Sequence, residues 1–313
     1  MSILVEKPGS KNLNSNLKFF TAPHVHLYKV NLLKMIRQKI VSSVVVAAGV
    51  TSFALSTLHP RPNCESPKSP TLHQRWEKKW SKNELGWQKS MPHETLVKHH
   101  QKVFPKTENL TVLVPLCGKT VDLVYLNSMP NVGRVVGVEG VKQAEEEFAF
   151  ENKDHNTDKI NFLTLDFFKL PEKKIEFDVV WDRAALVAVD PSLRVKYVDV
   201  LKQVVKRKGG VILLSTFDRR AGTPEALAGG PPFSVSEDEV RTLFTDFDSI
   251  VKIDEIDILS NPNYESTAMG FRAAGLTDLR EGVYVITNGD DRDKGFVSQI
   301  LKFFQGPCCS RCR

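Results

Sequence analysis

The sequence predicts an α/β fold of the Rossmann-like, doubly wound class with a mostly parallel sheet. Over 110–216, short runs rich in Val, Ile and Leu alternate with helical patterns. Alternation of this kind builds parallel strands joined by right-handed crossovers. Glycines and charged residues follow the ends of several predicted strands. A doubly wound sheet binds its ligand at that edge, so these residues are the first candidates for a functional site.

The individual elements follow from the spacing of apolar residues. Strands are short, β-branched apolar runs, and helices have apolar residues on one face. In chain order the sequence predicts strand 110–115, helix 120–128, strand 134–138, helix 142–152, strands 160–165 and 177–181, helix 191–208, strand 210–216, helix 236–244, and strands 250–258 and 282–287.

Two of the helices have recognisable ends. Pro191 suits the first position of the helix over 191–208, and Gly209 suits its C-terminal cap. Ser236 and Glu239 have the spacing of a capping box before the next helix.

The folded domain is expected over 74–288, between an N-terminal extension, 1–73, and a tail, 289–313. Four prolines in 59–72 predict a linker. The uncharged stretch 40–58 follows basic residues, which suits a membrane anchor or a mitochondrial presequence. The alternative is a weakly apolar extension without function. Met35 is a second candidate start.

Charge is concentrated in the extension. Residues 1–64 carry a net +7 and the remainder −1, whereas the whole chain carries +6. A nearly neutral body gives no reason to expect a nucleic-acid-binding surface. We expect a monomer whose partner is a small molecule.

The cysteines do not form a disulfide framework, because their number is odd and three of them crowd the end of the chain: Cys64, Cys117, Cys308, Cys309 and Cys312. This usage suits a reducing compartment. The last three are expected to be spare thiols of an unstructured tail, rather than ligands or acylation sites. Neither they nor His93, His99 and His100 have the spacing of a metal site.

Gly118 and Glu139 are the first candidate pair. Gly118 follows the first predicted strand, and Glu139 ends the second strand 21 residues later. An acid at this spacing in a Rossmann-type unit accepts the ribose hydroxyls of a cofactor. The alternatives are an ordinary turn and a solvated carboxylate at a helix start. The full Gly-x-Gly-x-x-Gly pattern is missing, which disfavours a nicotinamide dehydrogenase, and Leu113 replaces the first glycine of an ATP-binding loop.

The third and fourth strands end in further candidates. Asp166 suits the exocyclic amine of adenine and Phe167 the face of its ring. Their alternatives are a turn cap and a core side chain. Asp182 and Arg183 are expected to face the crevice at the end of the fourth strand, and an ion pair within a loop is the alternative.

Three tryptophans precede the first strand. Trp76 and Trp80 share one helical face, and with Trp87 they suit a lid over a cofactor and an aromatic substrate. The alternative is a helix anchored to the sheet by large side chains. The Gly-Gly-Pro-Pro-Phe segment at 229–233 suits a loop that covers substrate, or a plain connector.

Taken together, these segments resemble the thiopurine S-methyltransferase family. The similarity extends over 74–288 and rests on Trp-Glu-Lys-Lys-Trp at 76–80, Pro-Leu-Cys-Gly-Lys at 115–119, Gly-Val-Glu at 137–139, Asp-Phe-Phe-Lys-Leu-Pro at 166–171, Phe-Asp-Val-Val-Trp-Asp-Arg-Ala-Ala-Leu at 177–186 and Gly-Pro-Pro-Phe at 230–233. The resemblance implies a seven-stranded class I methyltransferase fold, S-adenosylmethionine as cofactor and a cytoplasmic location. A membrane-anchored or mitochondrial location remains the alternative for the extension.

The resemblance also implies roles for the matching residues. The cofactor is contacted by Trp76, Trp80, Leu116, Gly118, Glu139, Asp166, Phe167 and Arg183. The substrate is contacted by Trp87, Arg183, Pro232 and Phe233. Trp87 departs from the family, which commonly has Phe there.

These residues lead to a hypothesis of methyl transfer to the sulfur of a small aromatic or heterocyclic thiol. Arg183 is expected to stabilise the thiolate, and Asp182 to fix Arg183 or to accept a proton through water. Two alternatives remain open at this point. One is methylation of halide, thiocyanate or sulfide, and the other is a non-catalytic, membrane-tethered protein that binds the cofactor.

Overall fold

The computed structural model describes residues 71–289. The chain divides into two units, Met1–Ser66 and Pro67–Arg313, and every described residue belongs to the second. The candidate anchor at 40–58, the start at Met35 and the cysteine-rich end of the tail lie outside the described residues. Within 71–289, no helix combines the length and the apolar character that a membrane span requires.

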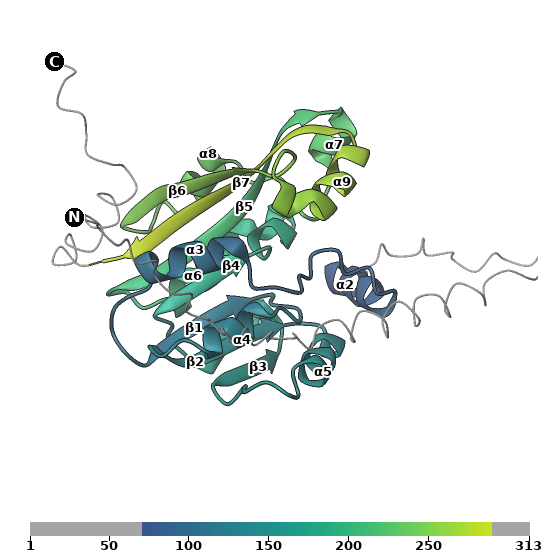
Figure 1. Ribbon diagram of the computed structural model, residues 1–313. Coiled ribbons are helices and arrows are strands. Elements are labelled where there is room, and N and C mark those ends of the chain that lie inside the picture. Colours follow the sequence, from purple (N-terminus) through teal and green to yellow (C-terminus); the bar gives the residue numbers. More distant parts are fainter. Residues whose placement is uncertain (1–70, 290–313) are drawn as a thin grey trace, which may run out of the picture. The chain divides into compact units, whose positions relative to one another are not determined.

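Seven strands form one sheet in the order β3-β2-β1-β4-β5-β7-β6 (Figure 1). Neighbouring strands from β3 to β5 are parallel, whereas β7 runs antiparallel to both β5 and β6. The prediction of a mostly parallel seven-stranded sheet is therefore confirmed. The strands are β1 (Leu110–Pro115), β2 (Val132–Glu139), β3 (Ile160–Thr164), β4 (Val179–Arg183), β5 (Gly210–Gly222), β6 (Ser249–Asp257) and β7 (Leu276–Asn288).

The α-helices of the described part are α2 (Leu72–Ser81), α3 (Glu94–Val103), α4 (Asp122–Asn127), α5 (Lys142–Glu151), α6 (Arg194–Val204), α7 (Pro224–Ala228), α8 (Glu237–Leu243) and α9 (Glu265–Ala273). Short 3₁₀ segments are η1 (Phe167–Lys173), η2 (Leu186–Ala188), η3 (Pro191–Leu193) and η4 (Pro262–Tyr264). The helices α4, α5, α6 and α8 and the helical face of α2 agree with the sequence pattern. That pattern does not predict α3, α7 or α9.

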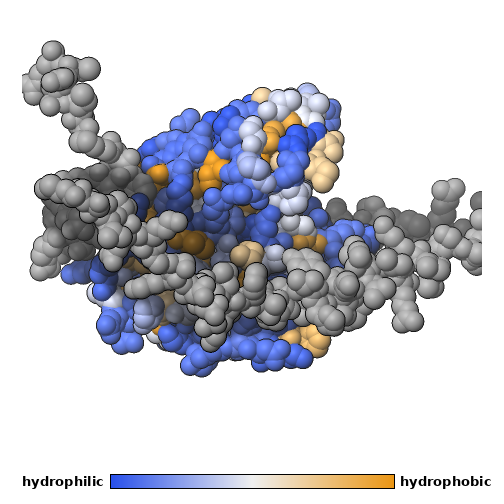
Figure 2. Space-filling view, viewed as in Figure 1, coloured by the Kyte–Doolittle hydropathy of each residue, from blue (hydrophilic) through white to orange (hydrophobic). Residues whose placement is uncertain are grey.

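Alternation along the strands separates the core into two layers. Successive side chains of a strand point to opposite faces of the sheet. Leu113 and Val136 accordingly pack on the face covered by α6 and α8, and Val112 and Val135 on the face covered by α3, α4 and α5. The face of the described part visible in Figure 2 is mostly hydrophilic, as expected when the apolar side chains are enclosed between the sheet and its helices.

The ends of α6 differ from their prediction. Asp190 caps a 3₁₀ turn that begins at Pro191, and α6 follows it. The helix ends at Val204 because Val205 turns extended and forms a bridge with Phe177. Gly209 has φ +72° and ends the turn that leads into β5, so the assignment of Gly209 as the helix cap is wrong.

The first turn of α8 carries half of the predicted capping box. Ser236 accepts a hydrogen bond from the backbone N–H of Glu239, at 3.2 Å. The Glu239 carboxylate accepts from Arg194 on α6 instead of returning to its own helix. The polar pair therefore joins two helices on the same face of the sheet.

One buried carboxylate fixes the segment that leads from α2 to α3. Asp122 accepts from the Trp181 indole Nε1 at 2.9 Å and from the backbone N–H of His93 at 2.7 Å. His93 is the N-cap of α3, and burial lowers its pKa to about 2, so its imidazole is a neutral acceptor for the N–H of Thr95. The connection ties α3 to the centre of the sheet and thereby fixes the segment 82–92.

Candidate active site

A cavity of about 640 Å³ lies at the carboxyl ends of the central strands. Leu116, Glu139, Arg183 and Phe217 line it from the ends of β1, β2, β4 and from β5. Further lining residues come from α2 and 84–89, and from α7, the loop after it and α9, which lie at the same end of the sheet in Figure 1. This is the edge at which doubly wound sheets bind ligands.

Glu139 is held in a cradle of backbone N–H groups. One carboxylate oxygen accepts from Gly140 at 2.7 Å and from Val141 at 3.1 Å, and the other accepts from Gly118 at 3.0 Å. Burial raises the pKa of Glu139, and the three backbone donors oppose that shift by stabilising the ionised form. A carboxylate has about four acceptor positions, so one remains for a hydroxyl in the cavity.

The backbone turns sharply at the ends of two strands. Gly118 has φ +54°, and a Cβ added there would lie 2.1 Å from the Gln88 amide nitrogen. Leu116 and Ala184 also have positive φ, at 44° and 64°. Such conformations each require about 1–3 kcal/mol from non-glycine residues, and they cluster at functional sites. Gly118 does not line the cavity itself, but its N–H holds Glu139.

Tryptophans form one wall of the cavity. The ring centroids of Trp76 and Trp87 lie 5.2 Å apart and those of Trp80 and Trp87 lie 6.4 Å apart, both pairs edge to face. Trp80 is almost completely buried against Val141 and Ala144, so it anchors α2 and lines the cavity at once. The anchoring interpretation therefore holds for Trp80, and the lid over a cofactor and an aromatic substrate stays a prediction. Aromatic faces attract cations, and desolvation strengthens that attraction.

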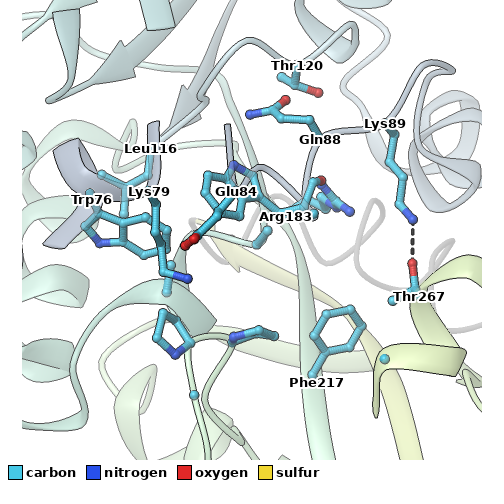
Figure 3. A pocket seen from close by; sticks show the side chains of 18 of the residues that line it. Trp76, Lys79, Glu84, Gln88, Lys89, Leu116, Thr120, Arg183, Phe217 and Thr267 are labelled. Carbon is cyan, nitrogen blue, oxygen red and sulfur yellow. Dashed lines mark hydrogen bonds between the residues drawn. The ribbon is translucent and has the colours of Figure 1, made fainter. Parts of the chain in front are cut away.

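Arg183 points into the cavity from the end of β4. Its guanidinium donates to the backbone carbonyl of Trp87 at 2.9 Å. In Figure 3, Arg183 and Lys89 lie toward one side with Phe217 below, and Trp76, Lys79 and Leu116 lie toward the other. Lys89 donates to the Thr267 hydroxyl of α9 at 2.6 Å. Lys89, Thr267 and Phe217 are not among the residues that the sequence predicts for the site. Only Phe217, which follows the predicted strand 210–216, had a usable signal.

Asp182 does not face the cavity, contrary to expectation. It is fully buried and accepts from the Tyr197 hydroxyl at 2.7 Å and from the Leu186 N–H at 3.1 Å. The reason is the alternation of side chains along β4, which sends Arg183 and Asp182 to opposite sides. Asp182 positions the turn after β4 and neither contacts Arg183 nor reaches a substrate.

The expectation for Phe167 also needs correction. Phe167 is buried and stacks on Tyr197, with ring centroids 4.7 Å apart, so it packs in the core and is not among the cavity residues. Asp166 is exposed and caps η1 by accepting from the Phe168 N–H at 3.1 Å. Neither side chain lines the cavity.

The loop after α7 contributes unequally. Pro232 lines the cavity, whereas Phe233 packs against Gly230 and donates its backbone N–H to Val187 at 2.7 Å. Arg219 lines the cavity too, and its guanidinium donates to the Pro232 carbonyl at 2.7 Å. Arg219 of β5 thus holds the loop in place. Phe233 stabilises the conformation of the loop but does not line the cavity.

We expect Asp182→Asn to change the pH dependence of stability. Burial raises the pKa of Asp182 to about 6. The folded state therefore binds this proton more tightly than the unfolded state, and ionisation destabilises the fold as the pH rises from about 4 to 6. Relative to the variant, the wild-type free energy of unfolding should fall by on the order of 3 kcal/mol between about pH 4 and 7. Denaturant titrations of both proteins measure it, and parallel pH curves would contradict the assignment.

No group of three His, Cys, Asp or Glu side chains within 71–289 is arranged to hold a metal ion. Cys117 is buried without a disulfide partner. Other polar side chains that line the cavity are Glu84, Gln88, Thr120, Glu225 and Ser266.

The family model and the relatives that match this chain carry the same name. A family model described as Thiopurine S-methyltransferase matches residues 71–289. The chain is similar to Thiopurine S-methyltransferase of Vibrio atlanticus, with 32% identity over 224 residues that cover 67% of this chain and 95% of the relative. It is 35% identical to the protein of that name from Aliivibrio salmonicida over 226 residues, which cover 67% and 97% of the two chains.

Solved structures agree on the fold. The [4+2]-cyclase SpnF superposes with a TM-score of 0.54 at 13% identity, covering 72% of this chain and 98% of that one. Phosphoethanolamine N-methyltransferase 2 of Haemonchus contortus, solved with phosphomonomethylethanolamine and S-adenosylhomocysteine, superposes with a TM-score of 0.53 at 12% identity. That match covers 72% of this chain and 61% of the other.

Proposed function

Because the chain belongs to the thiopurine S-methyltransferase family, we propose that its cavity brings S-adenosylmethionine together with a small aromatic or heterocyclic thiol. The chain is an S-adenosylmethionine-dependent S-methyltransferase. The observation that carries the proposal for the site is that Glu139 and Arg183 line one cavity walled by tryptophans. Glu139 can accept a hydrogen bond from the ribose of the cofactor, and Arg183 can stabilise the thiolate of a substrate bound beside it.

The residues present fit the cofactor. Glu139 has free acceptor capacity beside its three backbone donors, and the tryptophan wall suits a sulfonium cation. Trp76, Trp80, Leu116 and Glu139 would hold the cofactor, with Gly118 supporting Glu139. Asp166 remains our proposed acceptor for the adenine amine, because it follows β3, whose Thr164 pairs with Glu139. Phe167 is buried in the core and would not contact the cofactor.

The chemistry needs no protein nucleophile. When bound, the cofactor would supply a methyl group on a positively charged sulfur. The substrate thiolate would form a bond to the methyl carbon in line with the bond that breaks, and the cofactor sulfur would leave as the neutral thioether of S-adenosylhomocysteine. Arg183 favours the ionised substrate by placing a positive charge beside the thiolate, which lowers the pKa of the thiol. Trp87 and the other tryptophans exclude water and orient the reactants. The thiol proton leaves to solvent, since Asp182 is too deeply buried to accept it.

The experiment is a product assay with purified full-length chain, S-adenosylmethionine and two substrate sets. We expect methyl thioethers from aromatic and heterocyclic thiols, with kcat/KM far above the values for iodide, thiocyanate and sulfide. The cavity of about 640 Å³ is much larger than such small anions and favours the thiols. Methylation confined to the small anions would contradict the proposed substrate class, and cofactor binding without any product would contradict the reaction.

Domain bounds and cellular location are also proposals. We propose 74–288 as the catalytic domain, supported by the family match over 71–289, and the cytoplasm as the location, supported by the unpaired, buried Cys117. We keep the monomeric state as part of the same proposal, and sedimentation of the purified chain tests it.

A further inference from the structure

Lys89 and Arg183 lie toward one side of the cavity, and each has a neutral hydrogen-bond partner and no carboxylate partner within 71–289 (Figure 3). Lys89 donates to the neutral Thr267 hydroxyl at 2.6 Å, and Arg183 donates to the neutral Trp87 carbonyl at 2.9 Å. Both side chains are half-buried cavity residues. Among the described residues, neither of them forms an ion pair. Figure 3 shows the Lys89–Thr267 hydrogen bond beside Arg183.

The nearby acid does not neutralise them by contact. Glu281 is fully buried on β7, and one of its oxygens accepts from Ser215 at 2.6 Å and from Thr95 at 3.2 Å. The Nε2 atom of His93, a neutral imidazole, lies 3.8 Å from the same Glu281 oxygen. Glu281 therefore acts on Lys89 and Arg183 through its charge and forms an ion pair with neither.

The electrostatics of this arrangement favour a bound anion. Burial lowers the pKa of Lys89, and the charge of Arg183 lowers it further. Two like charges in a partly desolvated cavity destabilise each other, and an anion between them removes that destabilisation. The Thr267 oxygen accepts from Lys89, so its own hydroxyl proton remains available to a second acceptor.

The surroundings determine what kind of anion fits. Phe217 and Phe271 line the same part of the cavity and offer apolar faces to a ring. The thiolate accounts for one negative charge opposite Arg183, which leaves Lys89 and Thr267 for another. We propose that Lys89 and Thr267 form an anion subsite, and that the preferred substrates are aromatic thiols carrying a carboxylate. This proposal rests on the proposed function and specifies its substrate class.

The test compares the 2-, 3- and 4-isomers of mercaptobenzoate with the matching mercaptobenzamides, which have the same shape without the charge. For wild type, we expect at least one carboxylate isomer to have a KM about tenfold below that of its amide. Lys89→Met should raise that KM about tenfold and leave the KM of the amide within about twofold. Lys89→Arg should retain the preference. Lys142→Met, which removes a highly exposed lysine on α5, is the matched control for net charge.

A binding measurement separates the subsite from the reaction. In the presence of S-adenosylhomocysteine, calorimetry with the methylthiobenzoates and methylthiobenzamides should show the same dependence on Lys89. Equal losses for both classes in Lys89→Met, or no carboxylate preference in wild type, would overturn the anion subsite and leave the thiol methyltransferase intact. Absence of product from every thiol would overturn the proposed function instead, and the calorimetric comparison would still decide the subsite.

Discussion

Replacing Glu139 by alanine should weaken the binding of S-adenosylhomocysteine by roughly 100-fold or more. A hydrogen bond to a carboxylate contributes about 1.5–3 kcal/mol, which is roughly 10- to 100-fold in affinity, and the free acceptor position of Glu139 can bind one ribose hydroxyl. The change also removes the acceptor of the backbone N–H groups of Gly118, Gly140 and Val141. The turns at the ends of β1 and β2 would then lose the contact that joins them. Isothermal titration calorimetry measures the affinity directly.

Two further variants make this prediction specific. Glu146→Ala removes an exposed carboxylate of α5 and should leave the affinity unchanged within about twofold. Glu139→Gln keeps the size of the side chain but replaces one acceptor oxygen by a donor, which opposes a backbone N–H. Its affinity should be close to that of Glu139→Ala. If both Glu139 variants bound S-adenosylhomocysteine like wild type, the ribose assignment would be wrong.

The central strands β1, β2 and β4 were predictable because most of their residues are buried on both faces. Their runs of Val, Ile and Leu identify them without tertiary information, and β1 begins and ends where the sequence predicted. The lengths of β5 and β7 were not predictable from their apolar centres. Both strands continue past their apolar centres into polar segments that contain Arg219 and Arg280. These segments lack the apolar pattern of a strand, although β5 pairs with β7 from Gly210 to Gly222.

The site residues at strand ends could be predicted from the sequence. Those on other segments, Lys89 and Thr267, could not. Glu139 and Arg183 were identified because the fold class fixes the location of residues that follow β2 and β4. Thr267 lies on α9, which has only Ala268 fully buried and therefore no clear apolar periodicity. Lys89 lies in a segment without regular structure. Lys89 and Thr267 are far apart in the chain and come together only in the folded protein. The local sequence around each of them therefore could not predict the contact.

Asp182 and Phe167 failed for a different reason. Each is adjacent in the sequence to another candidate, Arg183 or Asp166, and adjacency in the sequence suggested adjacency in space. Asp182 and Arg183 are neighbours in the extended strand β4, where successive side chains point to opposite sides. Phe167 begins η1 directly after its cap Asp166, and its side chain packs in the core. Tyr197 of α6 contacts both residues from the core side. A residue count from Arg183 would have assigned Asp182 to the core.

Arg183→Gln should lower kcat/KM for an aromatic thiol by roughly 100-fold at neutral pH while S-adenosylhomocysteine still binds within about threefold. The loss follows from the missing positive charge, because hydrogen bonds to a charged group contribute about 1.5–3 kcal/mol in a partly desolvated site. Glutamine retains a donor for the Trp87 carbonyl, so the segment around Trp87 keeps its contact. Steady-state kinetics and calorimetry on the same preparation measure the two quantities.

The pH dependence distinguishes thiolate stabilisation from mere support of the Trp87 segment. A neighbouring cation lowers the pKa of the bound thiol, so removing it raises that pKa and moves the rise of kcat to higher pH. The variant should therefore recover activity as the pH increases. It should also recover with thiols whose electron-withdrawing substituents lower their own pKa, whereas wild type should be less sensitive to the substituent. Arg183→Lys should lie between the two proteins. A deficit that stays constant across pH and across substituents would mean that Arg183 acts only by holding Trp87, and that the anion of the substrate is stabilised by another group.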